Sequence, residues 1–212
     1  MIGSPVLAWL LTALFAATTA WCLRVLPSLG AWARVDAGWH ALMGAAMIAM
    51  IWHWGMAIPL APQVVLFALG CLWFLSRTAA GHSHSGGHTA PRGAGAHHAM
   101  MMAAMAWMVA TMPELMAGSD PDSGGGHHHA LGDAVSLSQS PASSPTALIA
   151  GHVALGLGFV ALCLPWLARA FALGRHLPDP RSPAPGREVA DCACHGAMSF
   201  GMGVMFLAML AG

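Results

Sequence analysis

The chain has 212 residues, of which 57% are hydrophobic and only 8% are charged, and its mean hydropathy is +0.64. Soluble domains carry a charge on about a quarter of their residues, so this composition excludes an ordinary soluble protein. The formal net charge is zero, which gives no indication of nucleic-acid binding. The sequence therefore predicts an integral membrane protein whose main partner is the lipid bilayer.

Six apolar stretches, each about long enough to cross a bilayer as a helix, predict an all-α membrane protein with six transmembrane helices. In chain order they cover residues 4–24, 38–57, 62–78, 97–117, 146–170 and 193–211. The whole chain, 1–212, is thus expected to form a single transmembrane domain. Two connecting segments differ in composition: 79–96 is a histidine-rich linker, and 118–145 is an acidic, histidine-rich segment typical of a flexible loop.

The arginines predict the orientation of these helices, because cytoplasmic loops are enriched in basic residues. All eight basic residues are arginines, and they fall in or beside the first, third and fifth connections: Arg24, Arg34, Arg77, Arg92, Arg169, Arg175, Arg181 and Arg187. Both termini are therefore predicted to lie outside, with the 79–96 linker in the cytoplasm and the 118–145 loop external. The composition is typical of a bacterial protein, so we expect it in the bacterial cytoplasmic (inner) membrane as a multi-pass protein.

One spacing, His-x2-Met-x3-Met-x2-Met, occurs in the second, fourth and sixth predicted helices. The three copies are His40, Met43, Met47 and Met50; His98, Met101, Met105 and Met108; and His195, Met198, Met202 and Met205. At about 100° per residue, these offsets place the four side chains of each copy on one face of a helix. The pattern predicts three pseudo-symmetric two-helix repeats, covering 1–57, 58–117 and 146–212.

If these three faces surround one axis, the histidines form a ring near the cytoplasmic side and the methionines form layers above it. Thioether sulfur is a soft, neutral ligand that suits Cu(I) and brings no charge into the bilayer. Cys192 and Cys194 precede His195 on the side facing the reducing cytoplasm, where thiols stay available as ligands. We therefore expect these histidines, methionines and cysteines to bind Cu(I). We also expect the protein to exchange Cu(I) with a metal chaperone on one side of the membrane.

The first, third and fifth predicted helices end in an aromatic residue three positions before an arginine. The pairs are Trp21 and Arg24, Phe74 and Arg77, and Trp166 and Arg169. This arrangement is typical of side chains that anchor a helix at the membrane interface. On this interpretation the three pairs position the helices and have no further role.

No pattern typical of an enzyme is present. The predicted spans hold no paired carboxylates, and the sequence has no phosphate-binding loop and no nucleophile motif. The spans are also expected to hold no buried Asp or Glu, which argues against a carboxylate proton relay. The sequence therefore indicates a protein that is not an enzyme.

Two other interpretations of the histidine and methionine pattern stay open. Methionine at 3-4-3 spacing also forms packing seams between helices, so the chain could instead be a structural or assembly subunit. Histidine and methionine at one depth could alternatively supply axial ligands to haem in a membrane redox protein.

The segment that begins at His98, with its counterparts at His40 and His195, resembles a family of actinobacterial integral membrane proteins defined by a domain of unknown function. That resemblance covers most of the chain and implies no established activity. The Met-x3-Met pairs resemble those of Ctr-type copper transporters, and Cys192-Ala-Cys194-His195 is similar in kind to the cytoplasmic copper exit of that family. The second resemblance is partial, because one chain here supplies all three methionine ladders, and it implies copper chemistry more than channel transport.

Overall fold

The computed structural model describes residues 4–52, 58–80, 94–117, 145–175 and 183–210. In these ranges helices are the only regular secondary structure, which confirms the predicted all-α class. The helices are α1 (Pro5–Val25), α2 (Ala31–Ile51), α3 (Leu60–Ala79), α4 (Ala94–Ala117), α5 (Pro145–Arg175) and α6 (Pro183–Ala208), with a short 3₁₀ turn, η1 (Leu26–Ser28), after α1. Most of the predicted 79–96 linker and nearly all of the 118–145 loop lie outside the described residues.

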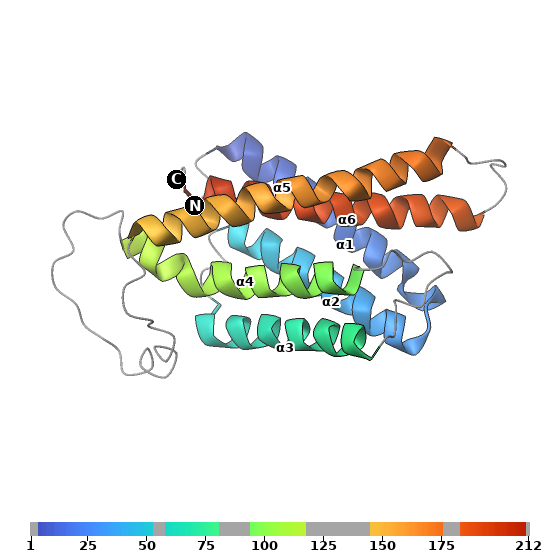
Figure 1. Ribbon diagram of the computed structural model, residues 1–212, viewed down its shortest axis with the longest axis horizontal. Helices are drawn as coiled ribbons and strands as arrows, with labels where there is room; N and C mark the ends of the chain where they lie inside the picture. The colour runs from blue at the N-terminus through green and yellow to red at the C-terminus, as the bar shows by residue number, and fades with distance from the viewer. Residues whose placement is uncertain (1–3, 53–57, 81–93, 118–144, 176–182, 211–212) are drawn as a thin grey trace.

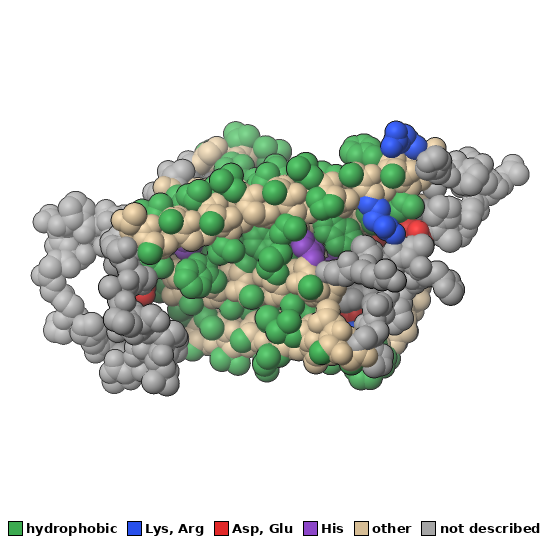
Figure 2. All heavy atoms as spheres, in the orientation of Figure 1, with side chains coloured by type: hydrophobic (Ala, Val, Ile, Leu, Met, Phe, Trp, Pro, Cys, Tyr) green, Lys and Arg blue, Asp and Glu red, His purple; other side chains and the backbone are tan. Residues whose placement is uncertain are grey.

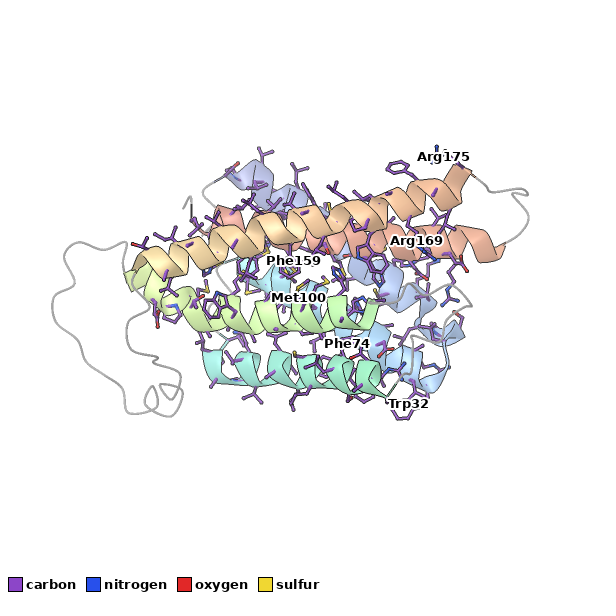
Figure 3. The ribbon with its side chains drawn as sticks, in the orientation of Figure 1. Trp32, Phe74, Met100, Phe159, Arg169 and Arg175 are labelled. Atoms are coloured by element: carbon purple, nitrogen blue, oxygen red, sulfur yellow. The ribbon has the colours of Figure 1, made fainter. Side chains whose placement is uncertain are left out.

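The six helices run alternately in opposite directions, so that the start of α1 and the end of α6 lie toward the same end of the bundle (Figure 1). Consecutive helices pack as pairs, α1 on α2, α3 on α4 and α5 on α6, and α1 also packs on α6. Basic side chains mark the opposite end of the bundle, as Arg169 and Arg175 show near the end of α5 (Figure 3). Arg24 and Arg77 likewise lie in the last turns of α1 and α3. We call this the basic end.

Three helices are long and apolar enough to cross a membrane: Pro5–Ser28, which is α1 with η1, Leu60–Ala79, which is α3, and Thr146–Arg175 in α5. Hydrophobic side chains lie over much of the face seen in Figure 2, and many large ones are well exposed. A surface of this kind is suited to lipid rather than water. The combination is typical of a membrane protein.

The other three helices, α2, α4 and α6, carry the histidine and methionine ladders and supply most of the buried apolar side chains. The sequence predicts spans in these helices too, but among the described residues only the three helices named above are long and apolar enough to cross a membrane. Histidines and glycines lower the hydropathy of α2, α4 and α6, and charged residues near the starts of α2 and α6 lower it further. These three helices form the interior of the bundle, whereas the more apolar α1, α3 and α5 expose more of their surface.

Two helices begin well before the apolar stretches predicted from the sequence. α2 begins at Ala31 rather than at residue 38, and α6 begins at Pro183 rather than at residue 193. Charged side chains end an apolar stretch without ending a helix, because most of them have good helix propensity. α2 also ends earlier than predicted, at Ile51, where Trp52 adopts an extended backbone.

Glycine allows the helices to approach closely at several points. A Cβ added at Gly203 of α6 would lie 2.7 Å from the carbonyl oxygen of Gly156 in α5. One added at Gly201, on the same helix, would lie 2.6 Å from the ring of Phe15 in α1. Small residues are typical of such contacts between membrane helices, because they let the backbones pack against each other. These contacts fix how α1 and α5 lie against α6.

Candidate metal centre

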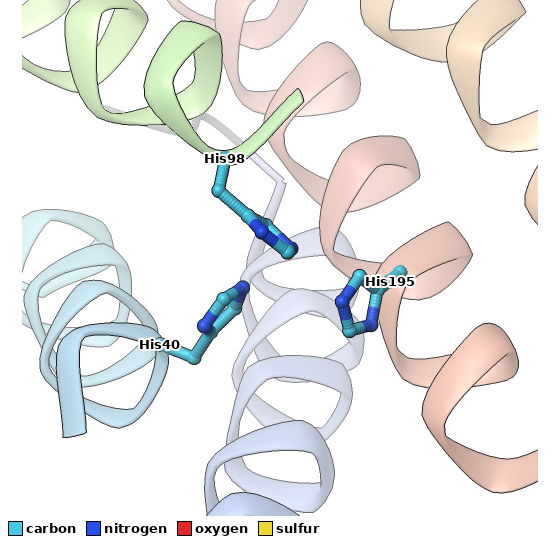
Figure 4. A group of neighbouring side chains, drawn as sticks. All are labelled: His40, His98 and His195. Carbon is cyan, nitrogen blue, oxygen red and sulfur yellow. The ribbon is translucent and has the colours of Figure 1, made fainter. Parts of the chain in front are cut away.

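Histidines from three helices meet inside the bundle. His40 of α2, His98 of α4 and His195 of α6 point toward one another (Figure 4), and one potential ligand atom of each lies within 4.8 Å of the others. The ring centroids are 4.1 Å apart for His40 and His98, 4.7 Å for His98 and His195, and 5.3 Å for His40 and His195. The three histidines that open the repeated motif therefore lie together, and we call them the histidine triad.

Two of the three imidazoles are oriented by the backbone of their own helix. Nδ1 of His40 lies 2.8 Å from the carbonyl oxygen of Asp36, and Nδ1 of His195 lies 2.7 Å from that of Asp191. A carbonyl oxygen can only accept, so Nδ1 carries the proton in each ring and Nε2 carries the lone pair. Metal-binding histidines typically donate their second ring nitrogen in this way, which fixes the ring orientation.

The triad is enclosed on one side and more open on another. His98 is 2% exposed and His40 is 7% exposed, whereas His195 is only half-buried. His195 of α6 is therefore the most exposed member of the triad. The interior position of His40 and His98 excludes much of the competing water from the centre of the group.

Aromatic rings of α3 and α5 cover the triad. The Phe74 ring centroid lies 5.2 Å from that of His98 and 5.7 Å from that of His40, and the Trp166 ring lies 4.8 Å from His195. Both aromatics belong to the pattern that predicts interfacial anchors. Phe74 is instead fully buried. Arg77, three residues later on the same face of α3, is buried as well, and Phe74 and Trp166 line the histidine triad.

Two aspartates behind the triad were not predicted from the sequence. The Asp36 carboxylate is buried, accepts a hydrogen bond of 2.8 Å from Nε1 of Trp73, and pairs with Arg77 at 3.3 Å. Asp36 lies two residues before the predicted span 38–57 but within α2, so this helix holds a buried carboxylate that the expectation for the spans did not cover. Asp191, in the corresponding place on α6, accepts a 2.8 Å hydrogen bond from Nε1 of Trp21. The sequence does contain a signal for both aspartates, since each lies four residues before a histidine of the repeated motif.

The methionine ladders face the interior, as their spacing predicts. Eight of them are at most 3% exposed: Met43, Met47, Met101, Met105, Met108, Met198, Met202 and Met205. They form one continuous apolar core with buried phenylalanines from α1, α3, α5 and α6. Met50 is half-buried and packs against this core.

The two cysteines before His195 are not part of the triad. Cys192 is buried and interacts with Arg169 of α5, whereas Cys194 is half-buried and interacts electrostatically with Cys22 of α1. Side chains two residues apart on a helix point in nearly opposite directions, about 160° from each other. The structure therefore separates the two thiols that the sequence groups into one Cys-x-Cys-His ligand set.

Two further buried histidines lie near the triad or deeper in the bundle, each with its own hydrogen-bond partners. Nε2 of His97 lies 2.9 Å from the Ser199 hydroxyl, and His152 lies 3.3 Å from the Thr111 hydroxyl and 2.9 Å from the Leu148 carbonyl oxygen. These contacts are typical of structural histidines that connect packed helices. His97 is thus a suitable control residue for experiments on its neighbour in the triad.

These features define a helical protein with three helices suited to a membrane and a group of three histidines that could hold a metal ion. The chain belongs to the family with the domain of unknown function DUF5134, whose profile matches residues 32–209. It is 32% identical over 221 residues to the uncharacterised proteins Mb0995 of Mycobacterium bovis and Rv0970 of Mycobacterium tuberculosis, with 99% of this chain and 99% of each relative covered. No solved structure matches the chain significantly. The predicted resemblance to an actinobacterial family is confirmed.

Proposed function

We propose that this protein is an integral membrane metal-binding protein that holds Cu(I) and takes part in its transport, storage or delivery. The observation that carries the proposal is the convergence of His40, His98 and His195, whose potential ligand atoms all lie within 4.8 Å of one another. Three imidazoles are a common ligand set for copper and zinc. Because each comes from a different helix, an ion bound here would also join the three helices.

The dimensions of the triad suit a single ion. A tetrahedral ion with metal–nitrogen distances of about 2.0–2.1 Å holds its nitrogen ligands roughly 3.3 Å apart. The potential ligand atoms lie within 4.8 Å of one another, so binding would draw them closer by up to about 1.5 Å. Backbone carbonyls hold Nδ1 of His40 and of His195, so Nε2 is the atom of each ring that would bind the metal.

Sulfur beside the triad favours Cu(I) over zinc. Met43, Met101 and Met198 each follow a triad histidine by three residues, a rise of about 4.5 Å along the helix, and each is 1% exposed. Thioethers select soft monovalent copper and are poor ligands for zinc. A Cu(I) ion leaving the imidazoles would meet neutral ligands in the apolar core, so no charged ligand is needed at membrane depth.

The proposed topology has six membrane-spanning helices in three repeats around the triad, with the basic end in the cytoplasm and both termini outside. Contacts between repeats support it, since each odd-numbered helix contacts an even-numbered helix from another repeat. These contacts are Trp21 of α1 with Asp191 of α6, Trp73 of α3 with Asp36 of α2, and Trp166 of α5 with His97 of α4. A cyclic succession of this kind is what a pseudo-threefold axis would produce.

The competing functions have different support. Full burial of the methionines among phenylalanines also suits a structural subunit whose ladders are packing seams. The haem alternative has less support, because the triad rings lie 4.1 to 5.3 Å apart and leave little room between them for a macrocycle. In the proposed copper function, a metal chaperone is the expected partner on either side of the membrane.

Replacing Met43, Met101 and Met198 together by leucine should lower the Cu(I) affinity of the purified protein at least about tenfold. Leucine keeps nearly the same volume and removes the sulfur ligands, so packing should change little. Competition with a chromophoric Cu(I) chelator in detergent measures the affinity. The control is Met102→Leu, since Met102 is equally buried on α4 but lies outside the ladders. Equal affinity in the triple variant and the control would favour the packing role.

A further inference from the structure

We propose that Cys22 of α1 and Cys194 of α6 form a second Cu(I) site, a pair of thiols at the basic end of the bundle beside the histidine triad. The inference rests on the proposed copper function for its choice of metal. The pairing itself rests on how α1 packs against α6.

The register of the two helices brings the cysteines together. Phe15 of α1 lies against Gly201 of α6, where an added Cβ would be 2.6 Å from the phenylalanine ring. The two helices run in opposite directions (Figure 1). Seven residues, or two helical turns, return each helix to nearly the same face. Seven residues forward on α1 is Cys22, and seven residues back on α6 is Cys194.

Two other contacts agree with this register. Nε1 of Trp21, next to Cys22, donates a hydrogen bond of 2.8 Å to Asp191, which lies one turn before Cys194 on α6. The two thiols also lie close enough that the charge of one thiolate would repel the charge of the other. Both cysteines are half-buried, whereas Cys163 and Cys192 are buried. The pair is therefore more open than those two thiols to an ion or to a protein that carries it.

The chemistry of two thiols suits Cu(I) in particular. Thiolates are soft ligands that select monovalent copper, and they must lose their protons to bind it. The balanced step is Cu⁺ + 2 RSH → [Cu(SR)₂]⁻ + 2 H⁺, with both protons released to water and no change in oxidation state. The negative charge of Asp191 nearby is offset by Arg187 at 3.9 Å and by the Trp21 indole N–H. Cys194 directly precedes His195, so the thiol pair would lie beside the more open side of the triad.

Cu(I) titration of the full-length protein tests the proposal. The protein should bind two Cu(I) ions per chain and show the ultraviolet charge-transfer absorption of a copper thiolate. The double variant Cys22→Ser, Cys194→Ser should bind one ion and lose that absorption, while Cys71→Ser, which removes a half-buried thiol of α3, should change neither. His98→Gln should instead lose the triad ion and keep the thiolate absorption.

These variants test the thiol site and the histidine triad independently of each other. Unchanged stoichiometry and absorption in the double cysteine variant would overturn the thiol site, whereas unchanged binding in His98→Gln would overturn the triad. Proximity is tested in a chain whose other cysteines, Cys71, Cys163 and Cys192, are replaced by serine or alanine. A short bifunctional thiol reagent should cross-link Cys22 to Cys194 within that chain. Absence of the cross-link, with both thiols still reactive toward a monofunctional reagent, would also overturn the pairing.

Discussion

Replacing His98 by glutamine should weaken Cu(I) binding at the histidine triad by at least about a hundredfold. His98 is the most buried of the three and contacts both other rings. Mutating a residue that hydrogen-bonds to a metal ligand typically lowers metal affinity 10- to 100-fold. Removing a ligand itself should therefore have a larger effect. Chelator competition on the purified protein measures the change in Kd.

The matched control for this variant is His97→Gln. His97 precedes His98 on α4 and is also buried, but its Nε2 contacts the Ser199 hydroxyl of α6 instead of the triad. This control should keep Cu(I) affinity within about threefold of the unchanged protein, even if it unfolds at a lower temperature. Equal losses of affinity in the two variants would mean that histidine substitutions act through packing alone, against the triad as a metal site.

Replacing Arg77 by methionine should destabilise the protein by about 3–5 kcal/mol, because it leaves a buried carboxylate without its ionic partner. Arg77 and Asp36 are each 7% exposed in their side chains and lie 3.3 Å apart. Trp73 would still donate to Asp36, but a neutral indole cannot balance its charge. Thermal unfolding in detergent should show a fall in Tm of about 10 °C.

Arg187→Met provides the comparison for this ion pair. Arg187 lies 3.9 Å from Asp191, and the two side chains are 36% and 44% exposed, so their pairing should contribute less than about 1 kcal/mol. The double variant Asp36→Asn, Arg77→Met should recover part of the lost stability, because it removes the unpaired charge. A drop in Tm for Arg77→Met no larger than for Arg187→Met would contradict a buried charge pair behind the triad.

The histidine triad could be predicted from the sequence because its signal is local. Helix periodicity places His40 and Met43 on one face, and three copies of the motif indicate that the faces meet. No knowledge of contacts between helices is needed for that step. The same periodicity correctly predicts that Met105 and Met202 are buried, since side chains on such a face must either pack together or meet lipid.

The surroundings of the triad could not be predicted, because they depend on how neighbouring helices are rotated and shifted against each other. Nothing in the sequence around Phe74 distinguishes a membrane anchor from a side chain that lines the histidine triad. Asp36 lies before the apolar stretch of α2, so hydropathy alone predicts that it lies in a loop. The register of α1 on α6, which pairs Cys22 with Cys194, depends on the contact between Phe15 and Gly201. Helix ends were misjudged for a related reason, since α6 continues through polar residues.

The odd-numbered helices are more apolar than the even-numbered ones, and this difference affects which side chains the interior can hold. The apolar surfaces of α1, α3 and α5 are suited to lipid, which leaves α2, α4 and α6 free to carry less apolar side chains in the interior. Imidazoles and thioethers can occupy that interior without the large desolvation cost of charged ligands. Where aspartates occur, at Asp36 and Asp191, they lie near the basic end and accept hydrogen bonds from indoles.

A crystallographic or electron-microscopic map of the protein loaded with Cu(I), or with Ag(I) as its redox-stable substitute, would locate the metal directly. The triad should hold one ion bonded to a ring nitrogen of each of His40, His98 and His195, at about 2.0–2.1 Å if copper resembles zinc in its bond lengths. A fully loaded protein whose metal lies only in other parts of the chain, with the three imidazoles unbonded, would contradict the metal centre on which the account depends.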